Sequence, residues 1–319
     1  MSLLALASPA SLKGVLAPAS AAAYLATGLR RSVDAFELPI ADGGEGTAAV
    51  LHATLGGEWR TTTVEDPLGR PVAARWLVLP DGAAVVDAAE AVGLPLLAPE
   101  ERDPLRASTR GLGQLLLAVL EGQPREVLVG VGGTATVDGG AAMRELVGEL
   151  HGVRVLCDVR NPLLGPRGAA RAFGPQKGAD ADAVEELERR LGSMDELEPF
   201  RDLPGAGAGG GLGAALASLG AKLCDGAALV LETIGFDERV RGAELVVTGE
   251  GTVDRTTLEG KAPGVVVRRC EALGVPCVLF GGLVRDGIDA RALSGDPDRA
   301  AADLEALGEE LGRTLLERA

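Results

Sequence analysis

Short apolar runs that end in glycine-rich, acidic loops recur along this chain and limit the folds open to it. One such run, Leu245–Val247, leads into a turn that carries Glu250 and Asp254. A helix-start signal follows, with Pro263 in the first turn. Strand, loop and helix in this order build an open parallel sheet, which binds ligands at the carboxyl ends of its strands. The stretch 246–261 is therefore predicted to form one wall of an active site.

The two ends of the chain share this strand–loop–helix pattern, whereas the middle does not. Near the N-terminus, Leu3–Ala7 and Ala35–Ile40 are predicted strands, and Ser20 is the predicted cap of the helix between them. Residues 61–88 instead alternate strand-like pieces with Pro and Gly turn signals, which predicts a β-meander. The change of pattern indicates a domain boundary shortly after Thr47.

The length of 319 residues fits about two domains. A discontinuous domain made from both chain ends, with the middle inserted, explains the pattern best. We expect the first domain to comprise residues 1–47 and 240–319, and the inserted mixed α/β domain to comprise residues 48–239.

Charge and composition exclude several classes of function. A net charge of −15 argues against a nucleic-acid-binding groove, which needs a basic face. No apolar run approaches the roughly 20 residues needed to span a bilayer, so we expect a cytoplasmic protein that binds no membrane. The four cysteines form no Cys-x-x-Cys pair and have no histidine cluster beside them. They are predicted to be free thiols rather than zinc ligands or disulfides.

Candidate ligand-binding residues gather in five loops of this glycine-rich kind. They are Asp42 and Glu45; Gly132, Gly133, Thr134, Thr136 and Asp138; Asp158 and Lys177; Gly209 and Gly210; and Glu250, Asp254 and Lys261. Backbone N–H groups of glycines at a helix start can bind an anion, and carboxylates can hold Mg²⁺. Each loop could also be only a tight turn with solvated acids. Together they suit Mg²⁺-dependent phosphoryl transfer, where catalysis is positioning and charge neutralisation.

Two other nucleotide-binding signatures are weak in this chain. Gly260-Lys261 is followed by Ala262 and lacks the upstream glycine spacing of a P-loop. Residues 205–210 satisfy G-x-G-x-x-G, but a dinucleotide site needs a preceding strand, and Pro199 and Pro204 precede this glycine run.

The motifs taken together resemble the bacterial-type glycerate kinase family, in order and over nearly the whole chain. The matching segments are Ala41–Thr47, Gly132–Gly140, Cys157–Gly165, Phe173–Gly178, Pro204–Gly213 and the stretch from Thr248 to Pro263. The resemblance implies ATP-dependent, Mg²⁺-assisted phosphorylation of D-glycerate to 2-phosphoglycerate. It also implies two α/β domains, one flavodoxin-like and one inserted, with the active site in the cleft. A homodimer is left open.

The resemblance implies a set of site residues by position, and their separate roles are inferred from their charge and from kinase chemistry. Asp254 is the expected general base for the glycerate hydroxyl, by analogy with a kinase carboxylate. Asp42 and Asp138 are expected to hold Mg²⁺ or substrate hydroxyls, with Asp42 counted among the catalytic residues. Three lysines are expected to bind phosphates or the glycerate carboxylate, and the first is also a catalytic candidate: Lys13, Lys177 and Lys261.

The chain departs from the family pattern at a few positions. Ala10 replaces an acid and Leu12 an aromatic residue in the first loop, Val137 replaces Asn, and Thr256 stands where Gln is usual. Because Ala10 removes a carboxylate near the expected site, a kinase for another small hydroxy acid is an alternative. A nicotinamide-dependent oxidoreductase and a non-catalytic ligand sensor are the alternatives from other classes.

Overall fold

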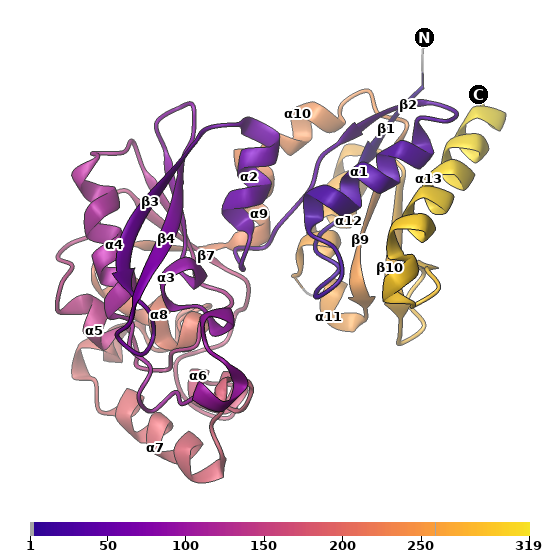
Figure 1. Ribbon diagram of the computed structural model, residues 1–319. Coiled ribbons are helices and arrows are strands. Elements are labelled where there is room, and N and C mark those ends of the chain that lie inside the picture. The colour runs from indigo at the N-terminus through magenta and orange to yellow at the C-terminus, as the bar shows by residue number, and fades with distance from the viewer. Residues whose placement is uncertain (1–2, 259) are drawn as a thin grey trace. The chain divides into compact units, whose positions relative to one another are not determined.

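The computed structural model describes residues 3–258 and 260–319, which form two compact units (Figure 1). Unit 1 comprises Met1–Asp42, Ala49–Thr54 and Ala227–Ala319, and unit 2 comprises Gly43–Ala48 and Leu55–Gly226. Each unit has its own β-sheet and its own hydrophobic core. The chain therefore enters unit 2 twice, first as the short segment Gly43–Ala48 and then as one long continuous piece.

Unit 1 is built on a parallel sheet. In the described chain its five strands are β1 (Leu4–Ala7), β2 (Asp34–Glu37), β9 (Leu245–Val253), β10 (Cys277–Val284) and β11 (Arg291–Ala292). Their order across the sheet is β11-β10-β9-β1-β2, and every neighbouring pair is parallel. Counted along the chain, this is the order 2-1-3-4-5 of flavodoxin-like folds. The flavodoxin-like parallel sheet expected from the sequence is therefore confirmed.

Two helices from opposite ends of the chain, α1 (Pro18–Leu29) and α13 (Ala300–Glu317), pack together on this sheet (Figure 1). A Cβ atom at Gly28 would lie only 2.0 Å from the Glu305 carbonyl oxygen, so a glycine is what lets the two backbones approach. The prediction that Ser20 caps α1 is wrong. Pro18 already occupies the first turn, where its fixed φ and missing N–H favour a helix start, and Ala17 is the N-cap residue.

Strand β9 is longer than the sequence predicted. Rather than stopping at Val247, it continues through Gly249 and Glu250 to Val253, because β10 pairs with it in parallel along this whole length. Gly249 fits under β10 only as a glycine, since a Cβ there would lie 2.2 Å from the Phe280 carbonyl oxygen. Glu250 is therefore a strand residue, and the turn begins at Asp254.

Six further helical elements of the described chain are assigned wholly or partly to unit 1. They are α2 (Thr47–Leu55), α9 (Gly226–Thr233), α10 (Phe236–Val240), α11 (Arg255–Leu258), α12 (Ala262–Leu273) and the 3-10 turn η5 (Pro297–Arg299). Helix α12 packs on β9 and β10. It begins at the predicted helix-start signal and carries Pro263 in its first turn.

Unit 2 is built on a mixed sheet, part of which is the β-meander that the sequence predicted. Its described strands are β3 (Glu58–Glu65), β4 (Pro71–Val78), β5 (Ala84–Asp87), β6 (Val127–Gly130), β7 (Val153–Cys157) and β8 (Lys222–Asp225), in that spatial order. The first three form an antiparallel meander, as the turn signals indicated. The last four are parallel neighbours, so their carboxyl ends lie at one edge of the sheet.

The helices of unit 2 are mostly short. They are α3 (Ala89–Val92), α4 (Arg110–Glu121), α5 (Ala141–Arg144), α6 (Ala169–Phe173), α7 (Ala181–Gly192) and α8 (Ala208–Ser218), with 3-10 turns η1 (Leu94–Leu96), η2 (Pro99–Glu101), η3 (Pro175–Lys177) and η4 (Asp195–Phe200). Their apolar side chains and those of the sheet form one continuous buried cluster of mainly Leu, Val and Ala. No helix in the described parts of either unit is long and apolar enough to cross a membrane.

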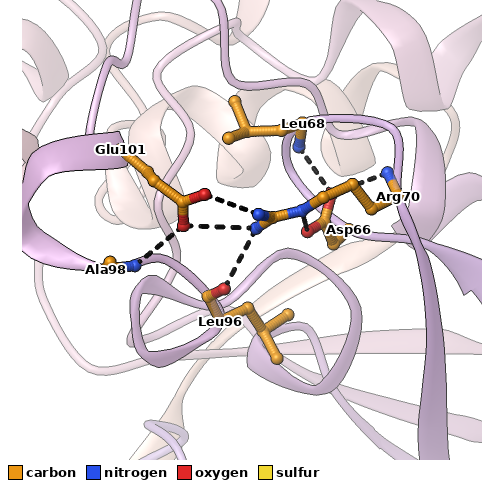
Figure 2. Close-up of polar contacts among 6 residues, drawn as sticks. All are labelled: Asp66, Leu68, Arg70, Leu96, Ala98 and Glu101. Atoms are coloured by element: carbon orange, nitrogen blue, oxygen red, sulfur yellow. Dashed lines mark hydrogen bonds and ion pairs between the residues drawn. The ribbon is translucent and has the colours of Figure 1, made fainter.

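A polar network fixes the loop between β3 and β4 (Figure 2). The buried Asp66 carboxylate accepts hydrogen bonds from the backbone N–H groups of Leu68 (2.8 Å) and Arg70 (2.9 Å) and from Arg70 Nε (2.6 Å). The Arg70 guanidinium also pairs with Glu101 at 2.6 Å. Burial opposes ionisation of Asp66, but the hydrogen bonds from Arg70 and Leu68 outweigh it and lower the pKa of Asp66.

Candidate active site

The predicted site residues of unit 2 meet at the carboxyl edge of its parallel strands. Strand β5 ends at Asp87, β6 ends at Gly130, and β7 ends just before Asp158. In the register of the sheet Asp87 lies beside Gly130, and Gly130 lies beside Leu156. The glycine-rich loop 131–140 and the two carboxylates therefore leave neighbouring strands at the same edge, where open α/β sheets bind ligands.

The short segment Gly43–Ala48 lies along this edge. The N–H of Gly132 donates to the Gly43 carbonyl oxygen at 3.4 Å. A Cβ at Gly132 would come within 2.6 Å of Gly44 Cα and 3.1 Å of Asp158 Oδ2, and one at Gly133 would lie 3.2 Å from Glu45 Cβ. The glycines are thus needed for close approach. They bring Glu45 and Asp158 next to the loop.

Lys177 is a buried part of this loop cluster. Its side chain projects from η3, is only 4% exposed, and donates from Nζ to Thr134 Oγ1 at 3.1 Å and to the Thr136 carbonyl oxygen at 2.8 Å. Burial lowers the pKa of Lys177 to about 8, while the negative charges of Asp158 and Asp138 oppose that change. Thr136 Oγ1 is also buried and has no hydrogen-bond partner in the described structure.

Asp138 organises the far end of the same loop. Its carboxylate accepts hydrogen bonds from Thr109 N (2.9 Å), Thr109 Oγ1 (2.7 Å) and Gly140 N (3.1 Å). Burial raises the pKa of Asp138, and these hydrogen bonds reduce the effect. Both oxygens are thus engaged within the protein, so Asp138 helps to fix the loop. The sequence contained no signal for Thr109, because a single threonine before a helix is a common cap.

Three consecutive glycines pack against the backbone of the loop 131–140. Gly209, Gly210 and Gly211 all have positive φ, between 62° and 97°. A Cβ at Gly210 would lie 1.9 Å from the Thr136 carbonyl oxygen, the same carbonyl that accepts from Lys177. The absence of a side chain at Gly209 and Gly210 therefore lets this backbone pack closely against the loop 131–140. The stretch before Gly205 is the 3-10 turn η4 followed by further turns, so the strand that a dinucleotide site requires is absent there.

Sequence reasoning missed Asp87, which is the most buried carboxylate at this edge. It accepts hydrogen bonds from the N–H groups of Gly46 (3.0 Å) and Ala48 (3.2 Å). Burial raises the pKa of Asp87 to about 7, with a smaller contribution from the charges of Glu90 and Glu45. A cavity of about 180 Å³ opens beside it. The available signal was an acid at the end of an apolar strand, the same signal that identified Asp158.

In unit 1 the candidate residues lie near the point where strand order reverses, between β1 and β9. The segment after β1 continues alongside β9, with Ala10 N donating to the Gly249 carbonyl oxygen at 2.8 Å. A Cβ at Gly251 would lie 3.4 Å from the backbone nitrogen of Lys13. The Lys13 side chain is exposed, and Asp42, which ends the first segment of this unit, is half-buried. Such switch points are the usual ligand sites of flavodoxin-like sheets.

Glu250, Asp254 and Lys261, all from the stretch predicted to form an active-site wall, lie in one cluster. Lys261 Nζ lies 3.4 Å from Glu250 Oε1 and 3.9 Å from Asp254 Oδ1. Thr257 donates to Glu250 Oε1 at 2.6 Å. The strand, the turn and the start of α12 thus bring two carboxylates and one ammonium together.

Thr256, the residue that departs from the family pattern, contacts the proposed base directly. Its hydroxyl donates to Asp254 Oδ1 at 2.5 Å and its backbone N–H donates to the same atom at 2.9 Å. The hydroxyl hydrogen bond is the main cause of a lowered pKa of Asp254, and the charge of Lys261 adds to it. Asp254 is therefore ionised at neutral pH.

The family model described as the glycerate kinase family matches residues 5–150 and 145–296 of the chain. The chain belongs to the glycerate kinase family. It is 38% identical to a protein named glycerate kinase from Halalkalibacterium halodurans, covering 88% of this chain and 86% of that one. It is 37% identical to a protein named glycerate 2-kinase from Escherichia coli, covering 79% of this chain and 77% of that one.

A solved structure supports the same assignment. The crystal structure of a putative glycerate kinase 2 from Salmonella typhimurium LT2 superimposes with a TM-score of 0.86 at 29% identity, covering 100% of this chain and 99% of that one. The resemblance to glycerate kinases inferred from six sequence motifs is therefore confirmed, and so is the mixed α/β fold that it implied.

Proposed function

We propose that this glycerate kinase family member transfers the γ-phosphoryl group of ATP to the C2 hydroxyl of D-glycerate, which gives 2-phosphoglycerate. The family match supports a kinase that acts on glycerate, because it extends over most of the chain. The choice of the C2 hydroxyl is supported by the similarity to the Escherichia coli protein named glycerate 2-kinase.

The observation that carries the proposal is the loop cluster of unit 2. It combines a buried ammonium, Lys177, with two closely packed glycines, Gly132 and Gly133, and a strand-end carboxylate, Asp158. Phosphoryl transfer demands little covalent chemistry from the protein and depends on charge neutralisation and positioning. We propose that this cluster, with Glu45, Thr134 and Thr136, binds phosphate or glycerate oxygens.

The cluster of unit 1 contains a carboxylate that could accept the glycerate hydroxyl proton and lysines that could neutralise phosphate or carboxylate charge. We propose Asp254 as the acceptor of the glycerate hydroxyl proton, since its lowered pKa keeps it ionised at neutral pH. In protein kinases a carboxylate likewise accepts the proton of the substrate hydroxyl. Lys13 and Lys261 are proposed to contact phosphate or carboxylate oxygens.

The donor set fits a metal ion that arrives with the nucleotide better than one held in a protein cage. The described residues contain no group of three or more His, Cys, Asp or Glu side chains arranged for a metal ion. Mg²⁺ commonly binds through one or two carboxylates and the substrate phosphates, where it neutralises phosphate charge. The Asp138 oxygens are occupied by Thr109 and Gly140. Asp158 is the proposed carboxylate contact in unit 2, and the metal-binding roles predicted for Asp42 and Asp138 stay predictions.

A coupled assay with Mg-ATP and D-glycerate tests the proposal, with the phosphorylated carbon of the product assigned by NMR. We expect turnover and a phosphate on C2. A folded preparation that binds ATP but gives no turnover above background would overturn the proposed activity, and a phosphate on C3 would overturn the proposed product.

A kinase for a different small hydroxy acid is the second candidate, and Ala10 is the observation that favours it. The Ala10 backbone lies against β9 one residue before Glu250, but the residue carries no carboxylate. A panel of hydroxy acids compared by kcat/KM separates the two candidates. D-Glycerate is expected to give the highest value, and a higher value for another acid would reassign the substrate.

A further inference from the structure

Asp87 makes an unusual pair of contacts for a carboxylate at a strand end. Its side chain is 5% exposed and accepts from the backbone N–H groups of Gly46 and Ala48. These N–H groups belong to the start of α2, where the first backbone donors of a helix have no partner within the helix. Asp87 therefore acts as the cap of a helix that lies elsewhere in the sequence, and its negative charge suits the positive end of the helix.

The opposite end of the same segment is also fixed. The Gly43 carbonyl oxygen accepts from Gly132 N at 3.4 Å, and a Cβ at Gly43 would meet the Leu156 carbonyl oxygen at 2.6 Å. Within the segment, Thr47 Oγ1 donates to the Gly44 carbonyl oxygen at 2.8 Å. Gly43 thus anchors one end of the segment 43–48, and Asp87 anchors the other.

Glu45 lies between these two anchors. A Cβ placed on Gly133 would lie 3.2 Å from Glu45 Cβ and 3.5 Å from Glu45 Oε2, so the Glu45 side chain runs beside the glycine loop. Its side chain is exposed. It lines the same 180 Å³ cavity as Asp87. The position of an exposed side chain on a short segment depends on how firmly the segment ends are held.

Among the described residues, no charged side chain forms an ion pair with Asp87 that would explain its burial. Glu45 and Glu90 repel it, and the charge of Arg75 attracts it from β4, although the Arg75 guanidinium pairs with Glu90 at 2.9 Å. The N–H groups that donate to Asp87 belong to the segment 43–48. A buried carboxylate is costly unless its hydrogen bonds are satisfied. The N–H groups of the segment 43–48 satisfy the Asp87 carboxylate, so its structural effect is exerted on this segment.

We propose that Asp87 is a positioning residue, which holds the segment 43–48 against the sheet edge and thereby keeps Glu45 beside Gly133 for substrate binding. The expected fall in kcat rests on the proposed function. The expected loosening of the segment 43–48 does not depend on that function.

Asp66 provides a matched control. It is also a buried aspartate of unit 2 that accepts backbone N–H groups, and its hydrogen bonds come from Leu68 and Arg70 of the β3–β4 loop, neither of which is a candidate site residue. Both Asp87→Asn and Asp66→Asn replace an acceptor oxygen with an NH₂ group that faces N–H donors. Only the first acts on the segment that carries Glu45.

The test combines amide hydrogen exchange with steady-state kinetics on the full chain. In Asp87→Asn we expect faster exchange in a peptide covering residues 43–48 and a fall in kcat for D-glycerate of about 10²-fold, the effect expected of a displacement of about 1 Å at a reacting centre. In Asp66→Asn we expect the exchange rate of residues 43–48 and the kcat for D-glycerate to match those of the wild type. Adding Asp87→Asn to Glu45→Gln should lower kcat little further, because the two changes act through one group.

Unchanged exchange at residues 43–48 in Asp87→Asn, or fully additive effects with Glu45→Gln, would overturn the inference. If Asp87→Asn does not fold, Asp87→Ser keeps an acceptor in a smaller side chain, and the same exchange and kcat criteria apply to it. The exchange measurement needs no turnover. A wild type that fails to phosphorylate glycerate would therefore sink the proposed function while the exchange result still decides whether Asp87 holds the segment.

Discussion

Replacing Lys177 with methionine should remove a specific dependence of stability on pH. The folded protein holds Lys177 with a pKa of about 8, against 10.5 for the unperturbed side chain. Between these two values the unfolded chain binds more protons than the folded one, so the free energy of unfolding rises with pH. At pH 10, two units above the folded pKa, the gain relative to pH 7 is roughly 2.5 kcal/mol. A methionine side chain cannot titrate, so the variant lacks this rise.

A constant offset accompanies the change but does not disturb the comparison. The variant leaves the Thr136 carbonyl oxygen without its hydrogen bond, which costs about 1–3 kcal/mol at every pH. Removal of the costly buried charge acts in the opposite direction at pH 7. The hydrogen-bond offset is the same at every pH. The change with pH of the stability difference between variant and wild type therefore reports the titration of Lys177, because the other titrating groups are common to both.

Urea unfolding followed by tryptophan fluorescence is a suitable assay for this prediction. Both tryptophans of the chain, Trp59 and Trp76, lie in β3 and β4, so the signal reports unfolding of unit 2, which contains Lys177. We expect the stability difference between wild type and Lys177→Met to shift by about 2.5 kcal/mol in favour of the wild type from pH 7 to pH 10. A stability difference that stays constant from pH 7 to pH 10 would refute the conclusion that Lys177 is buried with a lowered pKa in the folded protein.

Three further predictions concern the two clusters. Asp254→Asn should lower kcat by roughly 10²–10⁴-fold with little change in KM if Asp254 accepts the proton; an unchanged kcat in the coupled assay would reassign it. Thr256→Val removes the hydrogen bond that lowers the pKa of Asp254, so the acid limb of the kcat/KM profile should move to higher pH, and an unmoved limb would contradict the role of the hydroxyl. Gly210→Ala should destabilise unit 2 by about 3 kcal/mol or more, because its Cβ would meet a carbonyl oxygen at 1.9 Å. Gly220→Ala, with positive φ but its nearest neighbouring atom at 3.9 Å, should cost only about 1 kcal/mol; equal losses in the fluorescence assay would argue against the contact.

Local sequence patterns predicted much of the fold. The strand at Leu3–Ala7, the meander at 61–88 and the helix start at Pro263 all appear close to their expected positions, since apolar periodicity and Pro or Gly signals act within a few residues. The length of β9 could not be predicted in this way. Gly249 and Gly251 resemble turn residues locally. The strand extends past them because of pairing with β10, which follows later in the chain, and the hydrogen bond from Ala10 N to the Gly249 carbonyl oxygen.

In the candidate site, too, some features follow from local sequence patterns and others depend on tertiary packing. Residues at strand ends, such as Asp158, were found because loops at the end of parallel strands share an edge of the sheet. The burial of Lys177 and its bond to Thr134 depend on how two loops 43 residues apart pack, which no local pattern encodes. Asp87 carried the right signal but lacked flanking glycines, so its role as a cap for α2 emerged only from the three-dimensional contacts.

The place of β1 in the sheet of unit 1 has a consequence for how the chain folds. β1 lies between β2 and β9, and β9 begins at Leu245. During synthesis the first strand therefore has one unpaired edge until most of the chain has been made, whereas Leu55–Gly226 is continuous and can form its contacts earlier. Contacts of such long sequence separation slow folding.

A circular permutant that begins at Ala227 and joins the original ends would place all five strands of this sheet in one continuous segment. We expect it to fold faster than the natural chain, because β9 would no longer have to find a partner made roughly two hundred residues or more earlier.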